Sequence, residues 1–271
     1  MDADRDYVLG THDAEVERLA LQHRIWRGRA ADVWRRAGFT IGQTLLDVGC
    51  GPGHAAMDLA EIVGPAGRVV ALDRSRRFLD ALETQRARRG LANISVHEID
   101  LSEAALPPVI ADGAWCRWVF AFVRNPRHLL SRIHGALRPG GIFVAHEYLH
   151  YSTWRSAPRL AEHEELVRVV IESWRADGGE PDVGLDLPRW LEELGFEVRS
   201  LVPIVDVIDP SSFVWQWPKT FIDVGLSRLV DLERLTAERA AEIARALAAA
   251  EAAPHARMVT PTVLEIVAVR R

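Results

Sequence analysis

Cysteine is scarce in this sequence, because Cys50 and Cys116 are the only two in 271 residues. Two cysteines cannot build a disulfide framework or complete a zinc site by themselves. We expect both to be small packing residues, and we predict no metal site. His146, Glu147 and His150 resemble a metal cluster only superficially, because successive residues of a strand point to opposite faces.

Long apolar runs and a basic excess are also missing. No stretch of about 18 apolar residues occurs, so no membrane span is predicted. The formal charge of −5 disfavours a nucleic-acid partner, because surfaces that bind phosphates are normally basic. Residues 1–10 are acidic and polar, unlike a signal peptide. We therefore expect a cytoplasmic protein, a monomer or homodimer, whose partner is a small molecule rather than nucleic acid or membrane.

What is present is the pattern of an α/β domain. The hydrophobic content of 48% and the charged content of 26% are typical of a soluble protein with a sizeable core. We expect strands at 45–48, 68–73, 94–99, 114–120 and 141–146, helices at 55–63, 78–89 and 127–137, and further strands at 196–205 and 262–269. This alternation predicts a mainly parallel sheet covered by helices on both faces.

The flanking segments are predicted to add elements to one core. Helical spacing at 13–26 and 29–36 predicts two helical stretches before Gly38. Residues 151–176, 187–194 and 237–252 are expected to be helical, and 209–223 to be an irregular aromatic loop bounded by prolines. We expect a single domain over 1–271, with lid helices in 1–38, a cofactor-binding core in 39–150, a cap in 151–235 and a C-terminal helix and strand in 236–271.

The stretch TLLDVGCGPG at 44–53 places three glycines directly after a predicted strand. A strand, a glycine turn and a helix together present free backbone N–H groups at the carboxyl edge of a sheet, which is a ligand site. Dinucleotide enzymes use the spacing G-x-G-x-x-G. Here His54 occupies the place of the third glycine, where the helix packs closely on the strand, and the dinucleotide interpretation is therefore disfavoured.

Several motifs together resemble the class I S-adenosylmethionine-dependent methyltransferases. DVGCGPG resembles their first motif, and Asp73 follows Gly53 by 20 residues at the end of VVALD. HEIDL at 97–101, RWVFAF at 117–122 and LRPGG at 137–141 resemble later motifs in the same order. The resemblance covers about residues 40–148. It implies a Rossmann-like fold with a seven-stranded sheet, and S-adenosylmethionine as cofactor.

The resemblance also implies roles for individual residues. Asp73 is expected to accept hydrogen bonds from the ribose hydroxyls, and Asp100 from the adenine amino group. Asp47 either orients the turn or approaches the ammonium of the cofactor, and Arg117 either pairs with a surface acid or lines the site. The full expected cofactor set is Asp47, Gly49, Gly51, Gly53, Asp73, Arg74, Asp100, Leu101 and Arg117.

The implied reaction is methyl transfer to an N, O, S or C atom of a small molecule. Many relatives carry a histidine where Phe122 stands, so the expected general base is Glu147, with His146 and Tyr7 as further candidates. Tyr7 is either part of a lid or a frayed tail. The expected acceptor pocket comprises His12, Phe122, Tyr148, Tyr151, Trp215 and Trp217. The alternatives are a cofactor-binding regulatory or scaffold protein, or a fold relative with other chemistry.

Overall fold

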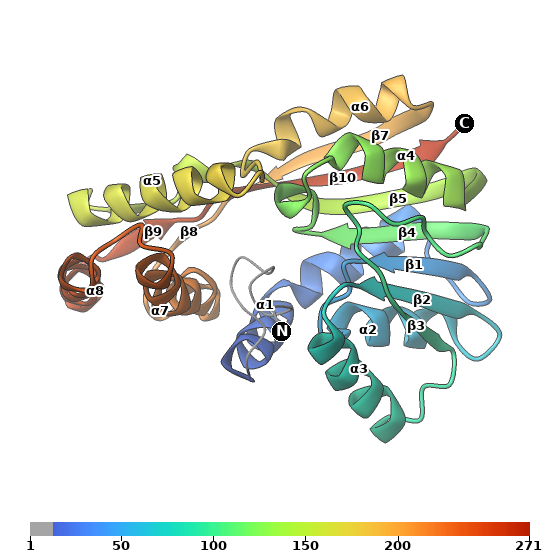
Figure 1. Cartoon of the computed structure of the whole chain (residues 1–271), viewed down its shortest axis with the longest axis horizontal. Helices are drawn as coiled ribbons and strands as arrows, with labels where there is room; N and C mark the ends of the chain where they lie inside the picture. Colours follow the sequence, from blue (N-terminus) through green and yellow to red (C-terminus); the bar gives the residue numbers. More distant parts are fainter. Residues whose placement is uncertain (1–12) are drawn as a thin grey trace.

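The computed structural model describes residues 13–271, and its centre is a seven-stranded sheet (Figure 1). The strand order is β3-β2-β1-β4-β5-β10-β7. Strands β1 to β5 pair in parallel, whereas β10 runs antiparallel to both β5 and β7. The strands are β1 (Thr44–Val48), β2 (Arg68–Asp73), β3 (Ile94–Glu98), β4 (Ala111–Arg117), β5 (Leu137–His150), β7 (Phe196–Ile204) and β10 (Thr262–Arg270). The predicted mostly parallel α/β fold is confirmed.

Two of the helices between the strands begin at side-chain caps. Helix α3 (Arg76–Arg88) is capped by Ser75, whose hydroxyl accepts a hydrogen bond from the Phe78 amide. Helix α4 (Pro126–Ala136) is capped by Asn125 and carries a proline at its first position. Helices α2 (His54–Val63) and α6 (Leu187–Glu193) also lie beside the sheet. The crossover helices α2, α3 and α4 connect parallel strands, so the carboxyl ends of β1 to β5 lie at one edge of the sheet.

The N-terminal segment is one continuous helix, α1 (Asp13–Ala37), so the predicted break into two stretches is wrong. Glycine at position 28 does not interrupt it, because a single glycine in a helix costs only about 1 kcal/mol. Trp26 is 1% exposed and Trp34 is fully buried. Two ion pairs tie the second half of α1 to distant segments, one from Arg29 to Asp206 and one from Arg36 to Glu265.

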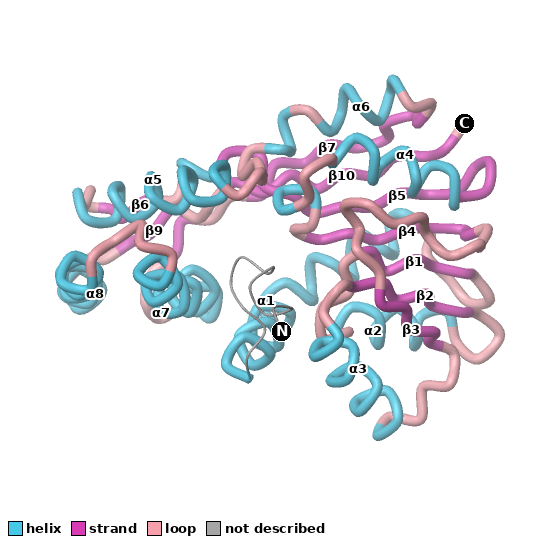
Figure 2. The backbone as a smooth tube through the Cα atoms, viewed as in Figure 1, coloured by secondary structure: helices cyan, strands magenta, loops and turns pink. Residues whose placement is uncertain are grey.

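A second group of elements, which we call the cap, lies beyond the carboxyl end of β5 (Figure 2). It contains the helices α5 (Ala161–Ala176), α7 (Gln216–Asp231) and α8 (Ala237–Ala252). It also contains a small sheet of β6 (Arg155–Ala157), β9 (Arg257–Val259) and β8 (Val207–Ile208). Helix α8 packs against both α5 and α7, so the cap reaches past residue 235, where the sequence analysis ended it.

Residues 209–223 are largely helical, which corrects the predicted irregular loop. A 3-10 turn, η4 (Phe213–Trp215), leads directly into α7. Pro218 lies in the first turn of α7, where a missing N–H costs no hydrogen bond. Trp217 and Phe221 stand one helical turn apart and are 4% and 7% exposed. Trp217 and Phe221 thus follow helical spacing and pack inward.

Strand β4 ends three residues earlier than predicted, at Arg117. Trp118 then adopts φ 52°, a left-handed conformation that is rare for a bulky residue. A 3-10 turn, η1 (Phe120–Phe122), follows. Strand β5 is longer than predicted and continues through residues 147–150 toward the cap. Both differences shape the edge of the sheet at which the site lies.

Within residues 13–271, no helix combines the length and the apolar character needed to cross a membrane. The same residues contain no cluster of three or more histidine, cysteine, aspartate or glutamate side chains arranged to hold a metal ion.

Candidate functional site

The glycine turn after β1 forms the floor of a pocket at the carboxyl edge of the sheet. Gly49, Gly51 and Gly53 have φ values of 72°, 52° and 83°. A Cβ at Gly49 would collide with Val119, and one at Gly53 would collide with Leu82. A Cβ at Gly51 would meet only the Leu19 side chain, at 4.0 Å. Gly49 and Gly53 therefore let the chain pack on itself, whereas Gly51, which lines the pocket, has free space where a side chain would stand.

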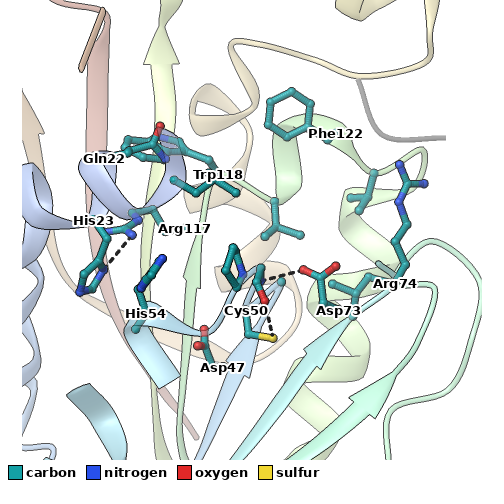
Figure 3. A pocket seen from close by; sticks show the side chains of 18 of the residues that line it. Gln22, His23, Asp47, Cys50, His54, Asp73, Arg74, Arg117, Trp118 and Phe122 are labelled. Carbon is teal, nitrogen blue, oxygen red and sulfur yellow. Dashed lines mark hydrogen bonds between the residues drawn. The ribbon is translucent and has the colours of Figure 1, made fainter. Parts of the chain in front are cut away.

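Asp73, at the end of β2, is tied to this turn. The backbone N–H of Gly51 donates to one carboxylate oxygen at 2.8 Å (Figure 3), and the N–H of Ser75 donates to the other at 2.9 Å. Asp73 is 8% exposed. Burial raises its pKa, and the two backbone hydrogen bonds oppose that shift. The acid and the glycine turn, separated by some twenty residues in the sequence, form one wall of the pocket.

Asp47 and Arg117 place opposite charges deep in the same pocket. Burial raises the pKa of Asp47 to about 7, although the Arg117 guanidinium opposes the shift. Burial lowers the pKa of Arg117 to about 10, so the side chain stays charged at neutral pH. One oxygen of Asp47 and the NH1 nitrogen of Arg117 are buried and have no hydrogen-bond partner among the described residues. Such groups are rare unless a ligand or water satisfies them.

A hydrogen-bonded chain holds Arg117 from the side of α1. Its NH2 group lies 3.3 Å from Nδ1 of His23. Nε2 of His23 lies 3.0 Å from a carboxylate oxygen of Asp58, which also accepts from Arg27 at 2.8 Å. A guanidinium can only donate, so Nδ1 of His23 is the acceptor and Nε2 carries the proton. His54 stacks on His23 with ring centroids 5.6 Å apart.

Eight of the nine residues predicted to contact the cofactor line this one pocket. They are Asp47, Gly49, Gly51, Asp73, Arg74, Asp100, Leu101 and Arg117. Gly53 does not line the pocket, and its packing against Leu82 explains the glycine there. Asp100 accepts a hydrogen bond from the Ser102 amide at 2.8 Å, which fixes the loop after β3.

The opposite side of the pocket is aromatic. It is lined by Trp118, Phe122, Tyr148, Trp174 and Phe221, which we call the aromatic wall. Of the residues predicted to contact the acceptor, Phe122 and Tyr148 belong to this wall. The other described ones pack outside the pocket lining, and these are Tyr151, Trp215 and Trp217. His12 lies outside the described residues.

Two of the predicted general bases, Glu147 and His146, belong to the described residues, and neither lines the pocket. Glu147 is fully buried, and its Oε1 accepts hydrogen bonds from the amides of Val119 and Phe120 at 2.6 and 2.9 Å. Burial raises the pKa of Glu147 to about 7, and these hydrogen bonds oppose the rise. Glu147 therefore anchors the turn after β4, which corrects the expectation that it faces the acceptor.

His146 is also fully buried and does not line the pocket. Its Nε2 lies 3.2 Å from Glu265, and its ring packs against Trp26 and Trp115. The cause is strand alternation together with the position of α1, which covers this face of β5. Tyr7, the third candidate, lies outside the described residues.

Sequence reasoning expected an N-terminal lid and a cap, but it missed the residues that α1, α5 and α7 contribute to the pocket. Arg18, Leu19, Gln22 and His23 line the pocket from α1, and Trp174 and Phe221 line it from α5 and α7. His23 does stand in the apolar stripe of α1, where a polar residue is a usable signal. No sequence signal links Trp174 or Phe221 to the site, because their approach depends on how the cap folds back.

Comparison with known proteins is consistent with this geometry. A family model described as methyltransferase domain matches residues 46–145. The demethylmenaquinone methyltransferase of Geobacillus kaustophilus is 32% identical over 126 residues, which cover 46% of this chain and 53% of that protein. The chain spans between 20% and 53% of the length of the first curated relatives that it matches.

Solved structures share the fold at low sequence identity. Coclaurine N-methyltransferase bound to N-methylheliamine and S-adenosylhomocysteine gives a TM-score of 0.58 at 18% identity, covering 90% of this chain and 72% of that one. The [4+2]-cyclase SpnF gives a TM-score of 0.56 at 20% identity, covering 89% of this chain and 80% of that one. Residues 46–145 thus match a methyltransferase domain, and the chain shares its fold with these solved structures.

Proposed function

We propose that the protein is an enzyme that transfers a methyl group from S-adenosylmethionine to a small-molecule acceptor. The observation that carries this proposal is the contact of Asp73 with the Gly51 amide at the floor of the pocket. It sets a carboxylate, which accepts hydrogen bonds from vicinal hydroxyls, beside a backbone that no side chain covers. That combination suits a nucleoside whose ribose lies close to the glycine turn.

The residues present fit the cofactor at each of its polar ends. Gly51 is open to the pocket, and Asp73 and Asp100 would accept from the ribose and the adenine amino group. Arg117 has a buried NH1 group without a partner among the described residues, and it would donate to the carboxylate of the methionine moiety. Asp47 would face the ammonium group. Its unpartnered oxygen supports that reading over a purely structural role.

S-adenosylmethionine supplies a methyl group on a positively charged sulfur, so the donor is already activated. The protein then has to hold the acceptor in line and exclude water. Holding two reactants in a productive geometry contributes up to about 7–11 kcal/mol. The aromatic wall, with Trp118 9% and Trp174 3% exposed, performs both tasks in this proposal.

We propose that none of the histidines among residues 13–271 acts as a general base. Burial lowers the pKa of His54 to about 4, so its imidazole is neutral at physiological pH and a weak base. Nδ1 of His23 is occupied by Arg117. Glu147 and His146 lie behind the pocket lining. In this proposal the described residues contribute to catalysis by positioning the acceptor against the methyl group.

The decisive experiment uses full-length protein, S-adenosylmethionine with a deuterated methyl group, and a set of candidate acceptors. We expect mass spectrometry to detect S-adenosylhomocysteine and a labelled product, both depending on the acceptor and both reduced in Asp73→Asn. Cofactor binding without any methyl transfer would favour the regulatory or scaffold alternative. Conversion of the acceptor without a mass label would favour other chemistry on the same fold.

The finer features of this proposal concern partners and location. We propose that the enzyme works in the cytoplasm, as a monomer or homodimer, and needs no nucleic acid. The formal charge of −5 supports the last point. Light scattering on the purified protein and a nucleic-acid gel-shift titration test the oligomeric state and the lack of nucleic-acid binding.

A further inference from the structure

The aromatic wall is assembled from four separate parts of the chain. Trp118 and Phe122 follow β4, Tyr148 belongs to β5, Trp174 to α5 and Phe221 to α7. Phe122 and Trp174 lie 4.7 Å apart between ring centroids, and Trp174 also contacts Tyr148 and Phe221 at 6.0 and 6.1 Å. The wall is therefore one connected set of rings that faces the pocket.

Trp118 gives this wall a fixed plane. Its indole stacks nearly parallel on Tyr148 and on Trp217, with interplanar angles of 16° and 13° and centroids 5.5 Å apart in both cases. Trp26 meets Trp118 edge-on at 5.1 Å. The left-handed backbone of Trp118 costs free energy and persists only where the surroundings enforce it, which is common at ligand sites. Tyr148 and Trp217 therefore hold the Trp118 indole in one orientation at the pocket, with 9% of the residue exposed.

The charges in the pocket are divided between its two sides. All three lining carboxylates, Asp47, Asp73 and Asp100, belong to or follow β1, β2 and β3. Among the described residues, none that lines the pocket from β4 onward is acidic, and Arg117 adds a positive charge there. A cationic acceptor would find no counter-charge on this side, and it would face the positive sulfonium of the cofactor.

We propose that the methyl acceptor is a planar aromatic compound, neutral or anionic, whose ring lies against the aromatic wall. This inference rests on the proposed function and narrows its acceptor to one chemical class. Aromatic rings bind one another in stacked or edge-to-face geometry with an attraction beyond burial alone. A group of aromatic rings could instead bind an organic ammonium ion through cation–π contacts. The distribution of carboxylates disfavours it here.

The test measures binding to the full-length protein saturated with S-adenosylhomocysteine. The probes are 2-naphthol, its saturated counterpart decahydro-2-naphthol, and choline. Calorimetry and tryptophan fluorescence should show that 2-naphthol binds at least about 10-fold more tightly than the saturated compound, and that choline does not bind. Equal or tighter binding of decahydro-2-naphthol or choline would overturn the inference.

Phe122→Leu tests the wall itself, because Phe122 is only partly buried and its replacement disturbs the core little. We expect about 3- to 10-fold weaker binding of 2-naphthol, the range that one ring contact is worth, and unchanged affinity for S-adenosylhomocysteine. Phe213→Leu is the matched control, since Phe213 is 55% exposed and does not line the pocket. An equal effect of the two substitutions, or no effect of Phe122→Leu, would contradict the proposal.

The same titrations separate this inference from the proposed function. If S-adenosylhomocysteine binds and 2-naphthol does not, the aromatic acceptor class is wrong and the methyl-transfer proposal stands. If S-adenosylhomocysteine does not bind but 2-naphthol binds in a manner that depends on Phe122, the pocket takes planar aromatic ligands and the methyl-transfer proposal fails.

Discussion

The guanidinium of Arg117 donates to Nδ1 of His23 at 3.3 Å, while the opposite ring nitrogen of His23 lies 3.0 Å from Asp58. This contact joins the end of β4 to α1 and, through Asp58, to α2. Burial alone would raise the pKa of Asp58, but its hydrogen bonds to His23 and Arg27 lower the pKa to about 2. This series of hydrogen bonds therefore ends at the Asp58 carboxylate, which stays ionised. The carboxylate fixes the tautomer of His23, and His23 in turn holds Arg117.

Asp58→Asn should loosen Arg117 without touching the pocket. We expect about 2- to 10-fold weaker binding of S-adenosylhomocysteine, which is the worth of one hydrogen bond. Arg27→Leu is the matched control, because Arg27 bonds the same carboxylate but is 58% exposed and lies outside the pocket lining. Calorimetry on both variants decides the matter. Equal losses of affinity would mean that Asp58 acts only by joining the two helices.

Substitution of two neighbouring glycines separates binding from folding. Gly51→Ala and Gly53→Ala both place a side chain at positive φ, so their backbone strain is comparable. The new methyl group at residue 51 enters the pocket, whereas that at residue 53 collides with Leu82. We expect Gly51→Ala to lower cofactor affinity more and Gly53→Ala to lower the melting temperature more. The reverse order, measured by calorimetry and thermal denaturation, would show that the turn is a purely structural feature.

Glu147→Gln should change how the stability depends on pH. Burial raises the pKa of Glu147 from 4.5 to about 7, so the folded state binds this proton more tightly than the unfolded state does. The associated stabilisation is complete below pH 4.5 and is lost as the pH rises through 7. The glutamine variant does not titrate. The free energy of unfolding of the variant minus that of the native protein should therefore rise by up to about 3 kcal/mol from low to high pH.

Urea unfolding at pH 5 and pH 8.5 measures this difference. Glu98→Gln is the control for the substitution itself, because the Glu98 side chain is 53% exposed. A Glu147→Gln variant that follows the native pH profile would show that Glu147 is ionised in the folded protein at neutral pH.

Helix α1 should respond to the cofactor only near its start. Trp26 is 1% exposed, and His23 and Arg29 tie the helix to α2 and to Asp206. We expect slow amide hydrogen exchange beyond His23 even without ligand, and added protection on binding S-adenosylhomocysteine only around Arg18 and Leu19. Added protection through the whole helix would show that α1 closes as a lid, as the sequence had indicated.

The sequence predicts the cofactor side of the pocket because its signals are local. The spacing from the glycine turn to Asp73 is fixed by one helix and one strand, so the two meet wherever this unit folds. The aromatic side could not be predicted in this way. Trp118 takes a conformation that its residue type disfavours, and Trp174 and Phe221 arrive from helices that only the folded cap places beside β4.

The errors of the sequence analysis have physical causes as well. Pro218 was interpreted as a loop boundary, although a proline is equally suited to the first turn of a helix, where it stands in α7. The sequence favours Glu147 as the base because a carboxylate at that position could orient a polar acceptor and take its proton. The turn at Trp118 instead presents two backbone amides that bind this carboxylate.

One titration tests the central claim most directly. S-adenosylhomocysteine and NAD are each titrated into the native protein and into Asp73→Asn, with Glu98→Gln as a control at the end of the neighbouring strand. We predict that the native protein and the control bind S-adenosylhomocysteine and not NAD. Asp73→Asn should bind S-adenosylhomocysteine about 10- to 100-fold more weakly, since two charge-assisted hydrogen bonds are lost. Binding of NAD in preference to S-adenosylhomocysteine, or unchanged affinity in Asp73→Asn, would contradict the account.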